Sequence, residues 1–139
     1  MRSCVHAIPL LLAFAMIAGL AGVCAAETTP DDVQVVDKKK VYFGDPDNFS
    51  RPAVISAKKI FDEIPAYKQI KEEGLDKNDP RYWTLLEKAN KVFKRVVKKV
   101  AENGGYDLVA EVGSLKGAEE FPNLTAECIE LVESGDAID

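Results

Sequence analysis

The chain has 139 residues, a hydrophobic content of 47% and a formal net charge of −5. These values suit a small protein with one domain and one modest hydrophobic core. A net negative charge disfavours binding to nucleic acid, because attraction to the phosphate backbone depends on an excess of positive charge.

Residues 1–26 have the three regions of a secretory signal peptide. A basic residue near the start precedes an apolar run over about 8–23, and small residues follow this run. An uncleaved membrane anchor is the alternative, but the run is short for a membrane span and contains proline and glycine. We therefore expect export of the protein, with cleavage between Ala26 and Glu27.

Cleavage at this junction would change the chemistry available to the protein. The one histidine, His6, and two of the three cysteines would leave, so that Cys128 alone could form no intrachain disulfide bond. Lipid attachment at Cys24 is not expected, because Val23 stands where a lipoprotein signal has Gly, Ala or Ser. The net charge would change from −5 to −6, because one basic residue leaves.

Residues 27–52 are expected to form a flexible leader with one or two short strands and a loop. The segment 33–44 is rich in β-forming residues at both ends. The segment 45–52 is dense in Asp, Pro, Asn and Ser, which favour turns. The main domain is expected to extend over residues 53–139.

A short strand at residues 53–55 should lead into a helix that begins after Ser56, its expected N-cap. Apolar residues recur at helical spacing from Ile60 to Ile70. Pro65 has no amide hydrogen to donate, so the helix should bend or restart there.

The longest element is expected to be a helix over residues 81–103. Asp79 and Pro80 form a strong start signal, as N-cap and first helical residue. Apolar side chains recur every three or four residues from Tyr82 to Val100, and a helix cannot bury such a stripe alone. The helix should therefore pack on another helix or on another subunit.

Gly104 or Gly105 should end this helix, since glycine adopts the left-handed conformation at low cost. A strand is then expected over residues 106–112, with alternate side chains on opposite faces. A last short helix should begin with Thr125 as its N-cap. Together these elements predict an α+β fold in which a helical hairpin packs with a small set of strands.

No catalytic, cofactor-binding or metal-binding motif is recognisable, so we expect a protein that is not an enzyme and has no cofactor. Cys128 has no basic partner nearby in sequence and fits a small buried apolar residue better than a nucleophile. The segment Asp45–Asn48 is similar to part of a calcium loop, but it lacks the glycine and the distal glutamate of the full pattern. An enzyme that uses carboxylates or Cys128 is the alternative.

The long helix carries a concentration of positive charge. Between Glu87 and Glu102 there are six basic residues and no acidic residue. We call these residues the basic stripe: Lys88, Lys91, Lys94, Arg95, Lys98 and Lys99. The stripe fits either a solvated helix face or a binding surface for acidic partners or an anionic membrane. Tyr82 and Trp83 lie at its far end, as candidate apolar anchors or as packing residues of the hairpin.

Two segments carry a family resemblance. Residues 58–70 read KKIFDEIPAYKQI and follow the expected strand, and residues 101–109 read AENGGYDLV. Both resemble the Skp/OmpH-like family of periplasmic chaperones, in which a strand leads into a helix with a pattern like V..VFDESPEYKKL. The family's returning helix also ends in glycine followed by YDLV. The segment Asn123–Thr125 resembles the family's closing DIT segment, and the whole resemblance covers roughly residues 52–132.

This resemblance implies a periplasmic homotrimer, in which strands of the subunits form a small β-barrel and helical arms project from it. The fold class expected on this basis is α+β, with a helical hairpin and a long returning helix packed against a small β-sheet or an oligomeric β-barrel core. The basic stripe, with Tyr82 and Trp83, would contact clients. The oligomer core would be formed by Val54, Ile55, Tyr106, Leu108, Val109, Ala110 and Val112.

The expected function is therefore that of an exported, non-enzymatic protein-binding module, a chaperone or holdase for unfolded outer-membrane proteins. The helical arms of the family are longer than those expected here, and residues 33–43 have no obvious counterpart in it. The alternative is an envelope-associated structural or adaptor protein with the same fold and no chaperone activity.

Overall fold

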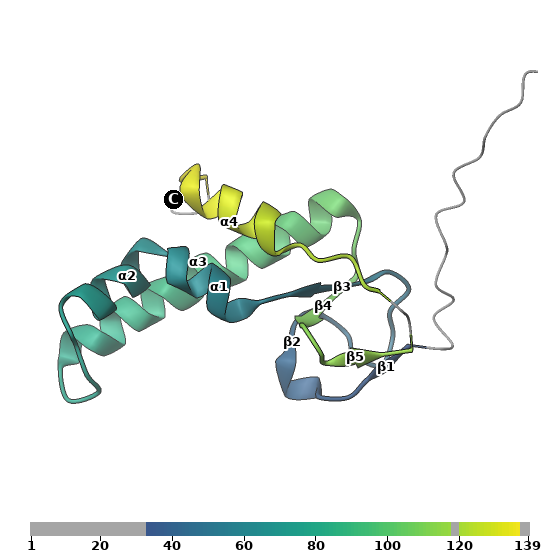
Figure 1. Cartoon of the computed structure of the whole chain (residues 1–139), viewed down its shortest axis with the longest axis horizontal. Helices are drawn as coiled ribbons and strands as arrows, with labels where there is room; N and C mark the ends of the chain where they lie inside the picture. The colour runs from purple at the N-terminus through teal and green to yellow at the C-terminus, as the bar shows by residue number, and fades with distance from the viewer. Residues whose placement is uncertain (1–32, 118–119, 137–139) are drawn as a thin grey trace, which may run out of the picture.

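The computed structural model describes residues 33–117 and 120–136, so the expected signal peptide, residues 1–26, lies outside the described residues. The chain has an α+β fold, with the strands gathered at one end of an elongated molecule (Figure 1). The elements in chain order are β1 (Gln34–Val35), the 3-10 helix η2 (Lys38–Lys40), β2 (Val41–Gly44), β3 (Pro52–Ile55), α1 (Ala57–Glu63), α2 (Pro65–Glu72), α3 (Pro80–Gly104), β4 (Leu108–Glu111), β5 (Leu115–Lys116) and α4 (Thr125–Glu133).

The strands form two small sheets, one of three strands and one of two. In the larger sheet the order is β2-β4-β3, with β2 antiparallel and β3 parallel to β4, while β1 and β5 form an antiparallel pair. A parallel pair needs a long connection between its strands. Here α1, α2 and α3 supply that connection, since they lie between β3 and β4 in the chain.

Residues 33–52 belong to the same fold as the described residues that follow them. β1 pairs with β5 and β2 pairs with β4, and Val33 is buried. The expected division at residue 52, between a flexible leader and the main domain, therefore does not separate two structural units. The strands expected in this segment exist, and partners from the second half of the chain hold them.

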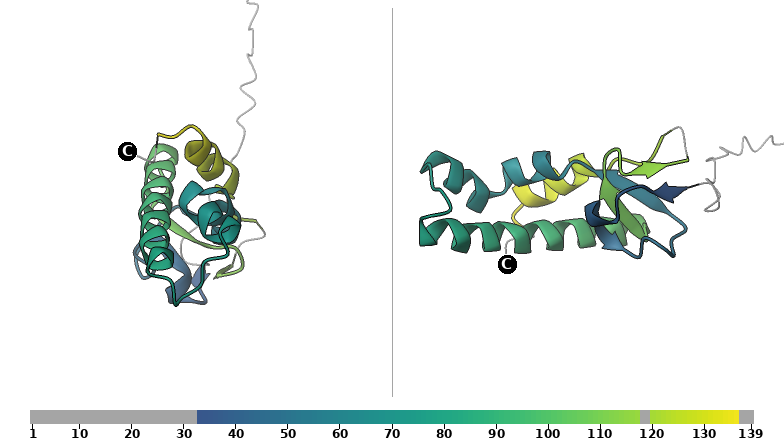
Figure 2. Two further views of the ribbon diagram at one scale, coloured as in Figure 1. Left: turned by 90° about the vertical axis from the view of Figure 1, so that its left-hand side faces the viewer. Right: turned by 90° about the horizontal axis from the view of Figure 1, so that it is seen from below.

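α1 and α2 lie in line and run antiparallel to α3, which packs against α2 along its first half (Figure 2). The break between α1 and α2 falls at Ile64, which ends one helix and precedes Pro65, the first residue of the next. The restart predicted at Pro65 is confirmed. α4 packs against both α1 and α3 and closes the helical layer.

The ends of α3 agree with the sequence prediction. Asp79 is the N-cap, and its Oδ1 accepts a hydrogen bond of 2.8 Å from the backbone N–H of Arg81, with Pro80 in the first turn. At the other end Gly105 has φ 69°, a left-handed conformation in which a side chain is strained.

The predicted N-cap is confirmed in position for α1 and is wrong for α4. Ser56 is the N-cap residue of α1, but its side chain accepts no capping bond. Instead the Glu111 carboxylate accepts a bond of 3.0 Å from the N–H of Ala57, and the N–H of Ser56 donates to Thr125 Oγ1. Thr125 is itself the first residue of α4, and Asn123 Oδ1 accepts bonds from its N–H and its hydroxyl. Residues distant in the sequence thus replace the expected local α1 cap.

β4 separates two clusters of buried side chains, one on each face of the sheet. The larger cluster joins the sheet to the helices and comprises Ala53, Ile55, Ile60, Ile64, Ala89, Phe93, Val96, Val97, Ala101, Val109, Leu124, Cys128 and Val132. The smaller cluster comprises Val33, Val54, Leu108, Ala110 and Leu115. Successive side chains of a strand point to opposite faces, so the side chains of β4 alternate between the two clusters. Both faces of β4 are therefore covered. The strand is also shorter than the predicted 106–112.

Candidate functional site: the basic face of helix α3

The basic stripe lies on the solvent side of α3. All six of its residues are exposed, whereas Ala89, Phe93, Val96 and Val97 on the other side of the same turns are buried. This separation follows from the helical period, because residues that recur every three or four positions share one face. The stripe is therefore one continuous basic surface, available without any change to the core.

Acidic residues flank the stripe but neutralise only part of it. Lys91 Nζ lies 2.7 Å from Glu87 Oε1, and Lys98 Nζ lies 3.8 Å from Glu102 Oε1. The hydrogen bond from Lys91 and its positive charge lower the pKa of Glu87. With six basic and two acidic side chains, residues 87–102 carry a net charge of +4 in a chain whose net charge is −5.

The remaining lysines of the stripe keep their charge uncompensated. Within residues 33–117 and 120–136, Lys88, Lys94 and Lys99 form no ion pair. Exposed ion pairs such as those of Lys91 and Lys98 contribute little net stability, because water and salt screen them. An acidic partner could therefore replace them at small cost.

A groove runs along one edge of the stripe, between α2 and the first half of α3. Its volume is about 450 Å³. Its wall on the α3 side contains half-buried Leu85 and Val92, and Ile64 and Ala66 lie on the opposite side. The full lining is Ile64, Pro65, Ala66, Gln69, Leu85, Lys88, Lys91, Val92 and Arg95. Three members of the basic stripe thus border an apolar depression.

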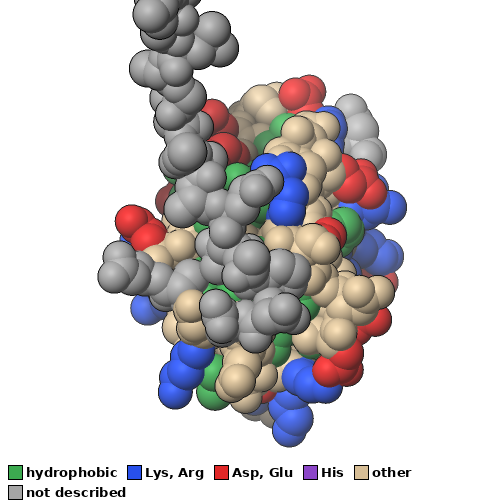
Figure 3. Space-filling view, turned by 90° about the vertical axis from the view of Figure 1, so that its right-hand side faces the viewer, with side chains coloured by type: hydrophobic (Ala, Val, Ile, Leu, Met, Phe, Trp, Pro, Cys, Tyr) green, Lys and Arg blue, Asp and Glu red, His purple; other side chains and the backbone are tan. Residues whose placement is uncertain are grey.

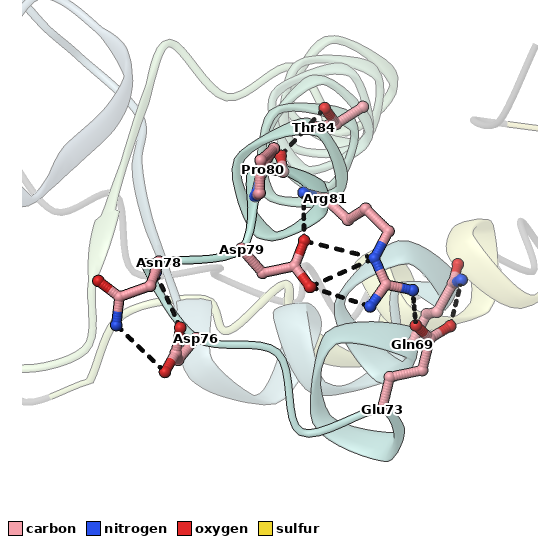
Figure 4. Close-up of polar contacts among 8 residues, drawn as sticks. All are labelled: Gln69, Glu73, Asp76, Asn78, Asp79, Pro80, Arg81 and Thr84. Atoms are coloured by element: carbon pink, nitrogen blue, oxygen red, sulfur yellow. Dashed lines mark hydrogen bonds and ion pairs between the residues drawn. The ribbon is translucent and has the colours of Figure 1, made fainter.

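Polar contacts at the tip of the hairpin hold α2 and α3 in position (Figure 4). Arg81 bridges the helices, with Nη1 at 2.9 Å from Glu73 Oε2 and Nη2 at 2.9 Å from Asp79 Oδ2. Gln69 Nε2 donates to Glu73 Oε1 at 2.6 Å. The hydrogen bonds from the Arg81 side chain and backbone lower the pKa of Asp79. The groove is therefore bounded by helices whose connection is well defined.

Tyr82 and Trp83 differ in their exposure. Tyr82 is half-buried, while Trp83 is 53% exposed. The two rings meet edge to face at 5.2 Å, and Trp83 Nε1 donates a hydrogen bond of 2.9 Å to the Lys77 carbonyl. Trp83 thus offers an apolar surface at the hairpin tip, and Tyr82 packs partly within the hairpin.

The residues expected in an oligomer core are mostly buried within the single chain. Val54, Ile55, Leu108, Val109 and Ala110 are at most 7% exposed. Their side chains already belong to the two clusters on either side of β4. They are therefore not surface residues that a second subunit could contact directly.

Two other residues expected in the oligomer core, Tyr106 and Val112, are accessible. Tyr106 is half-buried with the Arg51 guanidinium 5.3 Å from its ring centre, and Val112 is 51% exposed. Figure 3 shows the end of the molecule at which the strands gather. Where no grey atoms lie in front, acidic and basic side chains are interspersed with small hydrophobic areas.

The edges of the larger sheet differ in how they are covered. Beside β3, Val54 donates its N–H to the Pro122 carbonyl at 2.8 Å and accepts from the Leu124 N–H at 2.9 Å. In the described part of the chain, β2 pairs with β4 alone and carries an irregularity in register between Val41 and Phe43. Such bulges discourage pairing at an edge.

The other candidates for chemistry have structural roles. Cys128 is fully buried, and burial followed by the charge of Glu127 raises the pKa of its thiol to about 12, so it remains protonated near neutral pH. Asp45 Oδ1 accepts from the N–H of Asp47, which makes Asp45–Asn48 a turn. In the described ranges, no group of three or more His, Cys, Asp and Glu side chains is placed to hold a metal ion.

Sequence reasoning identified the basic side of the site and missed the opposite wall. Pro65, Ala66 and Gln69 lie about twenty residues before their neighbours on α3, and no pattern in the sequence connects them. Their role depends on the packing of α2 against α3.

Comparisons with protein-family models, curated proteins and solved structures found no significant match to this chain. Of the helices that the structure describes, none combines the length and the hydrophobicity needed to cross a membrane.

Proposed function

We propose that this protein is an exported, non-catalytic module that binds unfolded segments of other proteins, in the manner of the Skp/OmpH-like chaperones that it resembles. The observation that carries the proposal is the position of the basic stripe. Its six side chains are exposed on the face of α3 that points away from the core. A partner can contact this face without displacing any buried residue.

The charge distribution supports binding that is sensitive to salt. A local charge of +4 on a chain of net charge −5 attracts acidic segments to one face and repels them elsewhere. Since the stripe is exposed, added salt should weaken this attraction. Unfolded outer-membrane proteins are the client class that the resemblance suggests, and an anionic membrane surface would be attracted by the same charge.

A homotrimer is part of this proposal, and the structure limits how it could form. Five of the seven residues expected in the oligomer core are buried in the single chain. Subunits would therefore have to meet through accessible residues such as Val112, since the irregular register of β2 discourages pairing at that edge of the sheet. The native mass of the protein, measured by light scattering over a dilution series, tests this part directly.

The test of client binding is a charge reversal within the stripe. Replacing Lys91, Lys94 and Lys98 with Glu changes the net charge of residues 87–102 from +4 to −2. The matched control replaces Lys38, Lys39 and Lys40 with Glu, which are exposed lysines on η2 far from α3 in the sequence. We expect the α3 variant to lose salt-sensitive binding of an unfolded outer-membrane protein and the η2 variant to keep it. Equal binding by both variants and the original protein would remove the stripe from the mechanism.

A structural or adaptor role is the second candidate, and the size of the arm favours it. The 25 residues of α3 span about 37 Å, and α1, α2 and α4 already cover its apolar side. An arm of this kind encloses little space for a client. A monomer that does not prevent aggregation of unfolded protein, yet binds a folded envelope protein, would support this role over the first.

A further inference from the structure

We propose that the groove between α2 and α3 binds a short amphipathic helix whose apolar side chains enter the groove and whose carboxylates contact Lys88, Lys91 and Arg95. This inference rests on the proposed protein-binding function and assigns a particular ligand to one part of the surface. It differs from general attraction to the stripe, because Lys94, Lys98 and Lys99 do not line the groove.

The shape of the groove favours apolar side chains. Its volume of about 450 Å³ lies within the range of about 300–1,000 Å³ that is usual for ligand sites. Ile64 is fully buried at its base, and Ala66, Leu85 and Val92 are half-buried along it. Covering such partly exposed apolar surface is favourable, because it removes that surface from water.

The charges of the groove favour a partner that is acidic on one flank. On the α3 side the border is basic, with Lys88, Lys91 and Arg95, while on the α2 side Pro65 and Gln69 are uncharged. Lys88 forms no ion pair within the described residues, and the Glu87 partner of Lys91 is exposed. A helix with carboxylates along the flank that faces α3, and none along the flank that faces α2, would match the basic border on one side and the uncharged border on the other.

The spacing of the lining residues fits a helical ligand. On α3 the lining positions Leu85, Lys88, Val92 and Arg95 follow each other by three, four and three residues. They extend over about 15 Å, the length of nearly three helical turns. A helix laid in such a groove presents its own side chains at the same spacing, as in other helix-in-groove complexes.

The walls of the groove are held before any ligand binds. Ile64, the residue before α2, is fully buried in the same core cluster as Ala89 and Phe93 of α3, and α2 packs along α3. A groove formed in advance lowers the entropic cost of binding.

The test uses a synthetic helical peptide of about 14 residues, with Leu at positions spaced to one helical face and Glu along one flank. Fluorescence anisotropy measures its binding to the protein, and a peptide with Lys in place of Glu serves as the control. We expect the Glu peptide to bind at least about tenfold more tightly than the Lys peptide. Equal affinities would overturn the inference.

Two protein variants locate the binding site. Lys88→Glu places a repulsive charge on the groove, and its matched control Lys94→Glu makes the same change on a stripe residue outside it. We expect a loss of affinity for the Glu peptide of about tenfold for Lys88→Glu and a much smaller loss for Lys94→Glu. Equal losses would show attraction to the stripe as a whole and would contradict a groove site.

A third variant, Ala66→Phe, tests the apolar part of the site by filling the groove. It should abolish peptide binding while the circular dichroism spectrum stays unchanged, and unaltered binding by this folded variant would overturn the inference. If the variant does not fold, Lys88→Glu and Lys94→Glu still decide the question, because all of these positions on α3 are exposed. A dimer in light scattering that Lys88→Glu disrupts would instead identify a second copy as the occupant and would also overturn the inference.

The same variants separate this inference from the proposed function. Binding of an unfolded client that survives Lys88→Glu and Ala66→Phe, but not charge reversal of the stripe, would support the function and contradict the groove site. Failure of the original protein to bind any unfolded client, together with groove-dependent binding of the Glu peptide, would contradict the holdase function and support the groove.

Discussion

Replacing Phe93 with alanine should remove a large fraction of the protein's stability. Phe93 is 4% exposed and lies at the centre of α3, where its ring stacks on Phe61 at 4.7 Å and meets Tyr42 edge to face at 5.2 Å. Truncating a buried phenylalanine costs about 3–5 kcal/mol. Each aromatic pair adds about 0.5–1.5 kcal/mol beyond burial. Since the truncation cost already includes the lost ring contacts, the two pairs place the expected loss in the upper part of that range, about 4–5 kcal/mol, equivalent to a fall of roughly 15–20 °C in Tm.

The assay is urea unfolding followed by far-ultraviolet circular dichroism. Phe93→Leu is the matched control, because it retains most of the buried volume and loses the ring contacts, and it should cost less than about half as much as alanine. Trp83→Ala tests the surface, where a 53% exposed ring should contribute little. A loss below about 1.5 kcal/mol for Phe93→Ala would refute the placement of this residue at the centre of the core.

Three further changes test local features of the fold. Gly105→Ala should lower the free energy of unfolding by about 1–2 kcal/mol, because alanine is strained at φ 69°; an unchanged urea midpoint would contradict this. Asp79→Asn keeps a capping side chain but removes a carboxylate whose pKa is lowered in the folded protein. The stability that wild type gains from this carboxylate should be complete above pH of about 4 and should disappear as the pH falls through the lower folded-state pKa, so unfolding curves of the two proteins should converge only in acid. In protein that begins at Glu27, Cys128 is the one cysteine, and with its pKa raised to about 12 it should react with a thiol reagent at pH of about 8 rapidly in urea and slowly in the native state; rapid native reaction would show that it is accessible.

The helix boundaries were predictable because their signals are local. Asp79 and Pro80 start α3, Pro65 restarts the first helical segment, and Gly105 ends α3, each as the sequence indicates. Such signals depend on the conformation of one to three residues, which the sequence contains in full.

The capping of α1 was not predictable in this way. Ser56 has the right residue type for an N-cap, but the Glu111 carboxylate occupies that role and also accepts a hydrogen bond from the Tyr42 hydroxyl at 3.1 Å. Glu111 comes from a strand more than fifty residues later in the chain. Only the parallel pairing of β3 with β4 brings it to the start of α1.

One part of the candidate site was likewise predictable from local sequence, and the other part was not. The basic stripe could be predicted from the spacing of lysines on one helix, since helical periodicity alone assigns them to one face. The groove beside it could not, because its walls come from two helices whose relative position depends on packing around Ile64 and on the Arg81 bridge.

The sequence by itself determined where α3 begins and ends, that the helix before it restarts at Pro65, and that α3 has one apolar and one basic face, because these properties arise within a few consecutive residues. The tertiary structure decided the order of the strands, the burial of both faces of β4 and the accessibility of the residues expected in an oligomer core. These depend on contacts between distant segments. Such contacts form where many apolar side chains are removed from water together, and no local pattern specifies which segments meet.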